Sequence, residues 1–186
     1  MTLLIDVGMV LRTTVCDLYS NLVTRPTGAA VRTAIERQVL ETGSPVITTI
    51  DFSQVNLLDF SCADEIVAKL LLRYSQSGGP ISGYLLFRGI REAHLDPIET
   101  VLERHELALV AWLESGATLL GCISDDERRC WTAVHDSGPA WSDTVAAILG
   151  VSVSTADERL RHLTHRRLLM LRDDGFVVPG TFGTRT

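Results

Sequence analysis

Arginine, histidine and hydroxyl side chains gather near the end of the chain. The stretch Arg159–Arg172 holds five arginines and no acid, although the whole chain has a formal net charge of −6. On a helical wheel, Val153, Ala156, Leu160 and Leu163 fall on one side, which we expect to be buried. The polar residues that fall opposite or beside them are Ser154, Thr155, Glu158, Arg159, Arg161, His162, His165 and Arg166. Such donors suit base edges and phosphates, so this surface is expected to bind double-stranded DNA.

Two further residues bear on this surface, and two other interpretations of it stay open. Arg172, just beyond the helix, is expected to add a phosphate contact, whereas Glu158 either accepts from a cytosine amino group or weakens binding.

The arginines of this surface could instead simply be solvated and favour the helix C-terminus, or the surface could dock a protein. His162 and His165 are three residues apart and could share a metal, but no third ligand is evident, so no metal site is expected.

A second group of polar residues surrounds the start of a helix near the middle of the chain. Ser61 is expected to be the N-cap, with Asp64 and Glu65 in the first turn. Acidic residues are favoured there by the helix dipole alone, so we do not expect a catalytic carboxylate pair. The alternative is that Asp59, Ser61 and Asp64 form a phosphorylation or partner-docking site.

The remaining chemistry-bearing residues give no sign of an enzyme. Cys16, Cys62, Cys122 and Cys130 form no CxxC pair, so zinc is not expected. The chain contains no Gly-rich phosphate loop and no nucleophile elbow. We therefore expect a protein without enzymatic activity, cofactor or metal.

Composition indicates a folded protein of the cytoplasm. The chain has 186 residues, of which 46% are hydrophobic, enough for one roomy domain or two small ones. Its longest apolar run, residues 107–113, is far shorter than the roughly 18–20 residues of a membrane span. Asp6 interrupts the apolar N-terminal stretch, which has no preceding basic residue, so a signal peptide is not expected.

The first two thirds of the chain alternate between strand and helix patterns, which is typical of an α/β fold. We expect strands in residues 3–11 (one or two), 46–52, 84–87, 107–112 and 117–122. We expect helices in residues 26–42, from Ser61 onward, and from Asp96 to His105. Gly78-Gly79-Pro80 is expected to interrupt the chain.

The pattern changes at Ser124, which with Glu127 forms a capping box that opens a helix through Val134. Two more helices, residues 143–149 after Ser142 as N-cap and residues 154–167, are expected on either side of Gly150. Residues 168–171 and 176–178 then form a hairpin pattern. We therefore predict two domains, residues 1–123 and residues 124–186.

Two motifs in the first domain, Asp51-Phe52-Ser53 and Ser61-Cys62-Ala63-Asp64-Glu65, resemble a STAS-like family of unknown function related to anti-sigma factor antagonists. The resemblance implies an α/β sandwich that binds a regulatory protein, with a kinase-like ATPase as one candidate. In anti-sigma antagonists a serine at this helix start is phosphorylated. Here Phe60 occupies the aligned position, and Ser61 comes one residue later.

Residues 143–156 resemble the helix-turn-helix core of winged-helix regulators, in which Ala146 is small at the helix crossing and Gly150 provides the turn. The expected fold class is an α/β STAS-like sandwich followed by a small α+β winged-helix domain. The expected function is that of a transcriptional regulator which binds DNA through the second domain and senses a signal or partner through the first. The alternative is a partner-switching module without DNA binding. We expect a homodimer, because helix-turn-helix proteins usually bind two half-sites.

Overall fold

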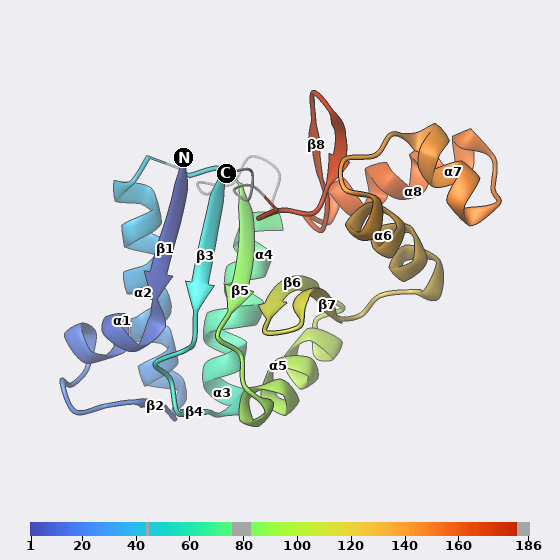
Figure 1. The fold of residues 1–186 in the computed structure, drawn as a ribbon. Coiled ribbons are helices and arrows are strands. Elements are labelled where there is room, and N and C mark those ends of the chain that lie inside the picture. The colour runs from blue at the N-terminus through green and yellow to red at the C-terminus, as the bar shows by residue number, and fades with distance from the viewer. Residues whose placement is uncertain (44, 76–82, 182–186) are drawn as a thin grey trace. The chain divides into compact units, whose positions relative to one another are not determined.

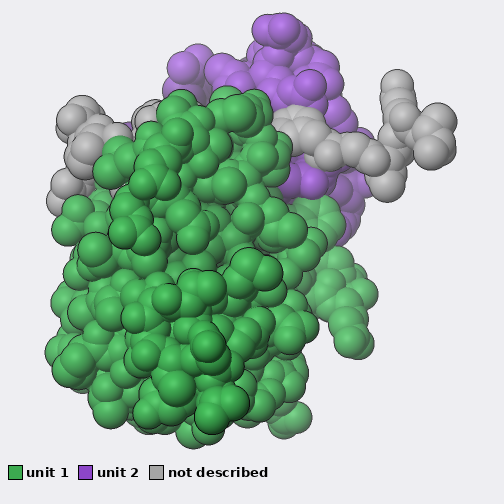
Figure 2. Space-filling view, turned by 90° about the vertical axis from the view of Figure 1, so that its left-hand side faces the viewer, with its two compact units in different colours: residues 1–122 green, residues 123–186 purple. Residues whose placement is uncertain are grey.

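The computed structural model describes residues 1–43, 45–75 and 83–181 of the chain. It contains two compact units, residues 1–122 and residues 123–186, which Figure 2 colours separately. The expected break at Gly78-Gly79-Pro80 lies outside the described residues. None of the helices within those ranges has the length and apolar character that crossing a membrane requires.

Unit 1 is a mixed α/β fold built on a mostly parallel sheet (Figure 1). Its strands are β1 (Thr2–Asp6), β3 (Ile47–Asp51), β5 (Tyr84–Arg88), β6 (Ala108–Leu113) and β7 (Gly116–Gly121), in the order β1-β3-β5-β6-β7. The first four run parallel, and β7 returns antiparallel to β6. Two short strands, β2 (Asn21–Leu22) and β4 (Leu57–Leu58), pair separately.

One face of this sheet carries the core of unit 1. The helical elements are α1 (Val7–Thr14), α2 (Arg25–Glu41), α3 (Phe60–Ala63), the π-helical turn η1 (Asp64–Ala68), α4 (Lys69–Ser75) and α5 (Glu92–Arg104). Strand register aligns Ile5, Ile50, Phe87 and Ala111 in one row across the sheet. All four belong to the buried cluster that also contains side chains of these helices. The helices are therefore packed against that face.

The expected second strand within residues 3–11 is wrong, because α1 begins immediately after β1. The carboxylate of Asp6 accepts a hydrogen bond from the backbone N–H of Met9 at 3.0 Å and so caps a helix. Gly8 allows a close approach in this helix, since a Cβ there would lie 2.5 Å from Cβ of Gln54. Val7, Val10 and Leu11 are buried, but on a helix and not on a strand.

The expected start of α5 at Asp96 is also wrong, because the helix begins at Glu92 and contains Pro97. Pro97 lies in the second turn of this helix, where it removes one i→i−4 backbone hydrogen bond, and the helix continues past it with that bond missing. The backbone N–H of Arg91 donates to Nδ1 of His94 at 3.3 Å, which helps to fix the earlier start. The other predicted helices and strands of unit 1 are confirmed, apart from the position of the cap near Ser61 treated below.

Over its described residues, 123–181, unit 2 contains three helices and an antiparallel hairpin. Its elements are α6 (Asp125–Ser137), α7 (Ser142–Leu149), α8 (Val153–His165), β8 (Met170–Arg172) and β9 (Gly175–Val177). The backbone of Ala140, between α6 and α7, exchanges hydrogen bonds with Phe176 of β9 at 3.1 and 2.8 Å. This bridge connects the hairpin to the segment that precedes α7.

Local capping explains where the helices of unit 2 begin. The predicted capping box at Ser124 and Glu127 is confirmed, with each side chain accepting from the other residue's backbone N–H. The N-cap predicted at Ser142 is wrong, because Trp141 takes that position. The hydroxyl of Ser142 donates instead to Oδ1 of Asp157 at 2.8 Å and so connects α7 to α8.

The turn between α7 and α8 depends on Gly150. This residue has a φ of 67°, in the left-handed region that glycine adopts without strain. Its neighbour Val151 donates to the carbonyl of Ala146 at 3.1 Å, and Ser152 then caps α8 by accepting from the N–H of Thr155 at 3.1 Å. Because the turn is short and capped on both sides, α8 is held at a fixed angle to α7.

Candidate functional site

The outer side of α8 is the strongest candidate site in unit 2. Ala156, Leu160 and Leu163 are fully buried, as expected, and attach the helix to its unit. Val153 was expected beside them but is 54% exposed. Side chains of a helix lean toward its N-terminus, so the first residue points beyond the helix end and not onto the packed neighbours.

The polar residues predicted for the opposite side of α8 do lie away from its buried stripe. The exposed members are Ser154, Glu158, Arg161, His162 and His165, and the half-buried members are Thr155, Arg159 and Arg166. Arg172 is exposed on β8. At the start of α8, the Ser152 hydroxyl lies 3.0 Å from that of Ser154 and 2.7 Å from that of Thr155, so three hydroxyls share one short network.

Carboxylates of the same unit pair with the arginines of this surface. Arg159 lies 2.5 Å from a carboxylate oxygen of Asp126, and Arg161 lies 2.6 Å from one of Asp157. Arg172 is more loosely associated with Asp174, at 3.8 Å. The cations are therefore positioned on the surface but are already partly neutralised.

Glu127 holds the most connected carboxylate of the surface. Its Oε1 lies 2.6 Å from Arg166 and 3.2 Å from His162, while its Oε2 accepts from the backbone and hydroxyl of Ser124. Burial alone would raise the pKa of Glu127. The hydrogen bonds from Ser124 and the guanidinium of Arg166 outweigh that effect and lower the pKa to about 2.

These residues border an open groove of about 590 Å³ between the first turn of α6 and α8. Asp126, Glu127 and Glu158 supply acidic groups to its lining, and Arg159, His162 and Arg166 supply basic ones. The sequence analysis did not predict that acidic residues of α6 line this groove, because it assigned Glu127 only to the capping box. The i,i+4 spacing of Asp157 and Arg161, in contrast, is a signal from which that ion pair could have been predicted.

The second predicted site, at the start of α3, is built around Asp59 and not Ser61. Asp59 is the N-cap: its carboxylate accepts from the backbone N–H groups of Cys62 at 2.7 Å and Thr24 at 3.0 Å. The N-cap predicted at Ser61 is therefore wrong, and its hydroxyl donates to Oδ1 of Asp59 at 2.8 Å. Burial would raise the pKa of Asp59, but these three donors lower it.

Asp64, the third member of the predicted group, lies away from the surface in the turn η1. Its side chain is 9% exposed and contacts Arg25 at 2.6 Å and His105 at 2.7 Å. Its neighbour Glu65, with 3% of the side chain exposed, contacts Arg25, Arg32 and Lys69. The structure therefore brings Asp59 and Ser61 together, whereas the buried carboxylate of Asp64 belongs to an ion network whose cations are partly exposed.

A strained backbone lies against Asp59. Thr24 has a φ of 82° and a ψ of 135°, a conformation that residues other than glycine rarely adopt. Its carbonyl accepts from the thiol of Cys62 at 3.1 Å. Burial, followed by the charge of Asp59, raises the pKa of Cys62 to about 12, so this thiol is a poor nucleophile. Ser61 combines a partly exposed hydroxyl with a hydrogen bond to Asp59, which fits modification or docking better than catalysis.

Comparison with known proteins identifies no relative: no family model, no curated protein and no solved structure matches the chain.

Proposed function

We propose that this protein is a transcriptional regulator. In this proposal unit 2 is a winged helix-turn-helix that binds double-stranded DNA, and unit 1 is a STAS-like domain that receives a signal through a partner protein. Neither unit carries out catalysis. The observation that carries the proposal is the two-sided α8, which is anchored by Leu160 and Leu163 and presents Arg161, His162 and His165 outward.

The residues around α8 support the proposal that unit 2 binds DNA. A major-groove helix must be fixed on one side and carry donors on the other, and Gly150 and Ser152 supply the short capped turn before it. A hairpin with exposed Arg172 follows α8 and would contact phosphates beside the groove. The Ala140–Phe176 bridge fixes that hairpin to its unit.

Unit 1 supplies the proposed input. The two motifs that resemble the STAS-like family lie at the end of β3 and at the start of α3. Ser61 is accessible beside Asp59, so a phosphate on Ser61 would add negative charge next to an existing carboxylate. That repulsion would alter the contacts by which a partner, such as a kinase-like ATPase, recognises the helix start.

A second candidate is a partner-switching protein whose unit 2 docks proteins and not DNA. The ion pairs of Arg159, Arg161 and Arg166 with carboxylates favour it, because a neutralised surface attracts phosphate less. The two candidates differ in salt dependence, since DNA binding weakens steeply as salt rises.

Selection of bound fragments from genomic and random DNA tests the proposal. The wild-type chain should enrich a defined sequence, and the R161A/R166A double variant should lose it while remaining folded. Arg37→Ala is the matched control, because Arg37 is 70% exposed on a helix and pairs with an acid four residues away, as Arg161 does. Enrichment of no sequence by the wild-type chain would contradict DNA binding.

A further inference from the structure

Helix α6 has a second side that plays no part in the α8 surface. Cys130, Trp131 and Val134 are buried within unit 2. Arg129, Thr132 and Asp136 share the opposite side, because they follow the spacing i, i+3 and i+7, and Ala133, which is 6% exposed, lies at the edge between the two sides. Arg129, Thr132 and Asp136 are exposed.

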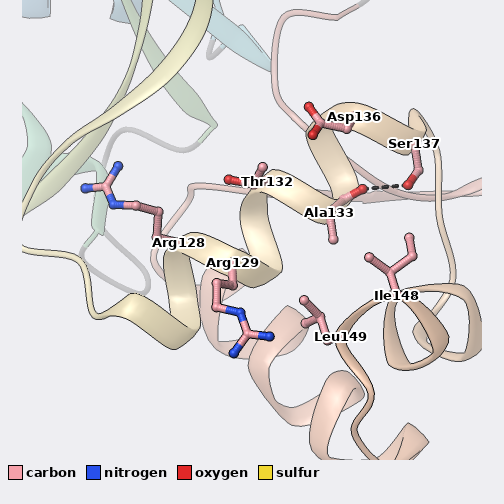
Figure 3. Close-up of a pocket in the computed structure, with 8 residues that line it drawn as sticks. All are labelled: Arg128, Arg129, Thr132, Ala133, Asp136, Ser137, Ile148 and Leu149. Atoms are coloured by element: carbon pink, nitrogen blue, oxygen red, sulfur yellow. Dashed lines mark hydrogen bonds between the residues drawn. The ribbon is translucent and has the colours of Figure 1, made fainter.

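This side of α6 borders a shallow pocket of about 630 Å³ that also includes the end of α7 (Figure 3). Ala133 lies in the middle, and Ile148 and Leu149 supply apolar contacts from α7. Ile148 is 54% exposed, a large value for so apolar a side chain. Arg129 and Asp136 lie toward opposite ends of the pocket, and Arg128 adds a second cation to its lining. The surface therefore has small or apolar side chains near its centre and opposite charges toward its two ends.

We propose that this surface is the interface of a homodimer, in which α6 packs antiparallel against α6 of a second copy. A two-fold axis midway between Thr132 and Ala133 would exchange position 129 of one copy with position 136 of the other. Each Arg129 would then face Asp136 of the other copy, forming two symmetric ion pairs about 10 Å apart along the helix.

The chemistry of the surface favours a second copy over another partner. Because one patch carries both an arginine and an aspartate at matched distances from its centre, it is complementary to itself when inverted. The small side chains of Thr132 and Ala133 allow two helix axes to approach to about 8–10 Å. A parallel arrangement would place arginine against arginine. Asp136 already contacts Nδ1 of His135 through Oδ1 at 2.8 Å, and a carboxylate has a second oxygen to accept from arginine.

The interface can be tested by charge exchange in the full-length chain, independently of DNA. Two single variants, R129E and D136R, are compared with the wild type by sedimentation equilibrium. The R129E copy carries two carboxylates at the interface and the D136R copy carries two arginines, so each alone should be monomeric. An equimolar mixture should form heterodimers, because the repulsive patches are complementary to each other. Asp173→Arg is the control: it makes the same change at an exposed position of the hairpin turn and should stay dimeric.

A second measurement tests the position of the two-fold axis between Thr132 and Ala133. Thr132→Cys should form an intermolecular disulfide on mild oxidation, whereas Thr144→Cys, exposed on α7, should not. A wild-type chain that is monomeric throughout, or a dimer that R129E and D136R both leave intact, would overturn the proposal. Single variants that fail to associate even when mixed, although circular dichroism shows that they are folded, would overturn it as well.

Discussion

Arg166 Nη1 lies 2.6 Å from Oε1 of Glu127, a residue 39 positions earlier in the chain. The same oxygen lies 3.2 Å from Nε2 of His162. The first turn of α6 therefore places carboxylates where, in the proposed complex, DNA phosphates would bind. Phosphate must replace carboxylate at these cations, so the acids of α6 should limit affinity for DNA.

Removing these carboxylates should tighten DNA binding. Glu127→Gln and Asp126→Asn keep the size of each side chain, and the glutamine oxygen can still accept from the Ser124 N–H. Because surface ion pairs contribute about 0.2–1 kcal/mol, we expect each substitution to raise affinity about 1.4- to fivefold at constant salt. Fluorescence anisotropy with a selected duplex measures the effect.

Asp125→Asn is the control for this experiment, because it removes the same charge from the same turn. Among the described residues the structure gives Asp125 no ion pair. If Asp125→Asn tightens binding as much as the other two, the gain comes from net charge alone and the pairing explanation fails.

Glu127 should also make stability depend on pH in the acid range. Its pKa is about 2 in the folded protein against an ordinary value of 4.5. Between these values the unfolded chain binds the proton and the folded chain does not. The contribution of Glu127 to stability is therefore complete above pH 4.5 and is lost as pH falls toward 2. Urea unfolding across this range should show a shallower decline for Glu127→Gln than for the wild type.

His94 should make the folded protein less stable as pH falls, because the histidine becomes protonated in the unfolded chain. The ring is fully buried against Phe52, and burial lowers its pKa below the ordinary 6.5. The unfolded chain therefore gains a proton that the folded chain excludes, and stability falls as pH drops below 6.5. Between pH 7 and 5, His94→Gln should lose less free energy of unfolding than the wild type. Equal losses in both proteins would show that the ring is protonated in place.

The sequence predicted most elements of the fold, because buried stripes and capping residues are local signals. Helix α2 and the Ser124 capping box are examples. The prediction was wrong where the local sequence was compatible with two structures. Residues 7–11 are apolar enough for a strand, but Asp6 caps a helix there. Likewise Asp59 and Ser61 can both cap a helix. Asp59 takes the position because its carboxylate accepts from the nearby Cys62 N–H and also from Thr24, 35 residues away.

Only the part of the candidate site that depends on local sequence signals was predicted. The outward side of α8 follows from helical periodicity alone. The carboxylates that pair with it could not be predicted, since Asp126 and Arg159 are 33 residues apart and meet only through the packing of α6 against α8. The ion network of Arg25 with Asp64 and Glu65 likewise joins segments about 40 residues apart.

Stability measurements can show whether Asp59 or Ser61 caps α3. Asp59→Ala removes an acceptor for three hydrogen bonds and should lower the free energy of unfolding by about 2–3 kcal/mol. Ser61→Ala removes one partly exposed donor and should cost less than about 1 kcal/mol. Chemical denaturation of both variants measures the difference. A larger loss for Ser61→Ala would assign the cap to the serine.

The salt dependence of binding to a selected duplex tests the central claim most directly. The logarithm of the wild-type association constant should fall linearly as the logarithm of salt concentration rises. The slope should become shallower by about one for Arg161→Ala, through loss of one phosphate contact, and should not change for Arg37→Ala. Binding that is independent of salt, or a wild-type chain that binds no duplex, would contradict the assignment of α8 to DNA.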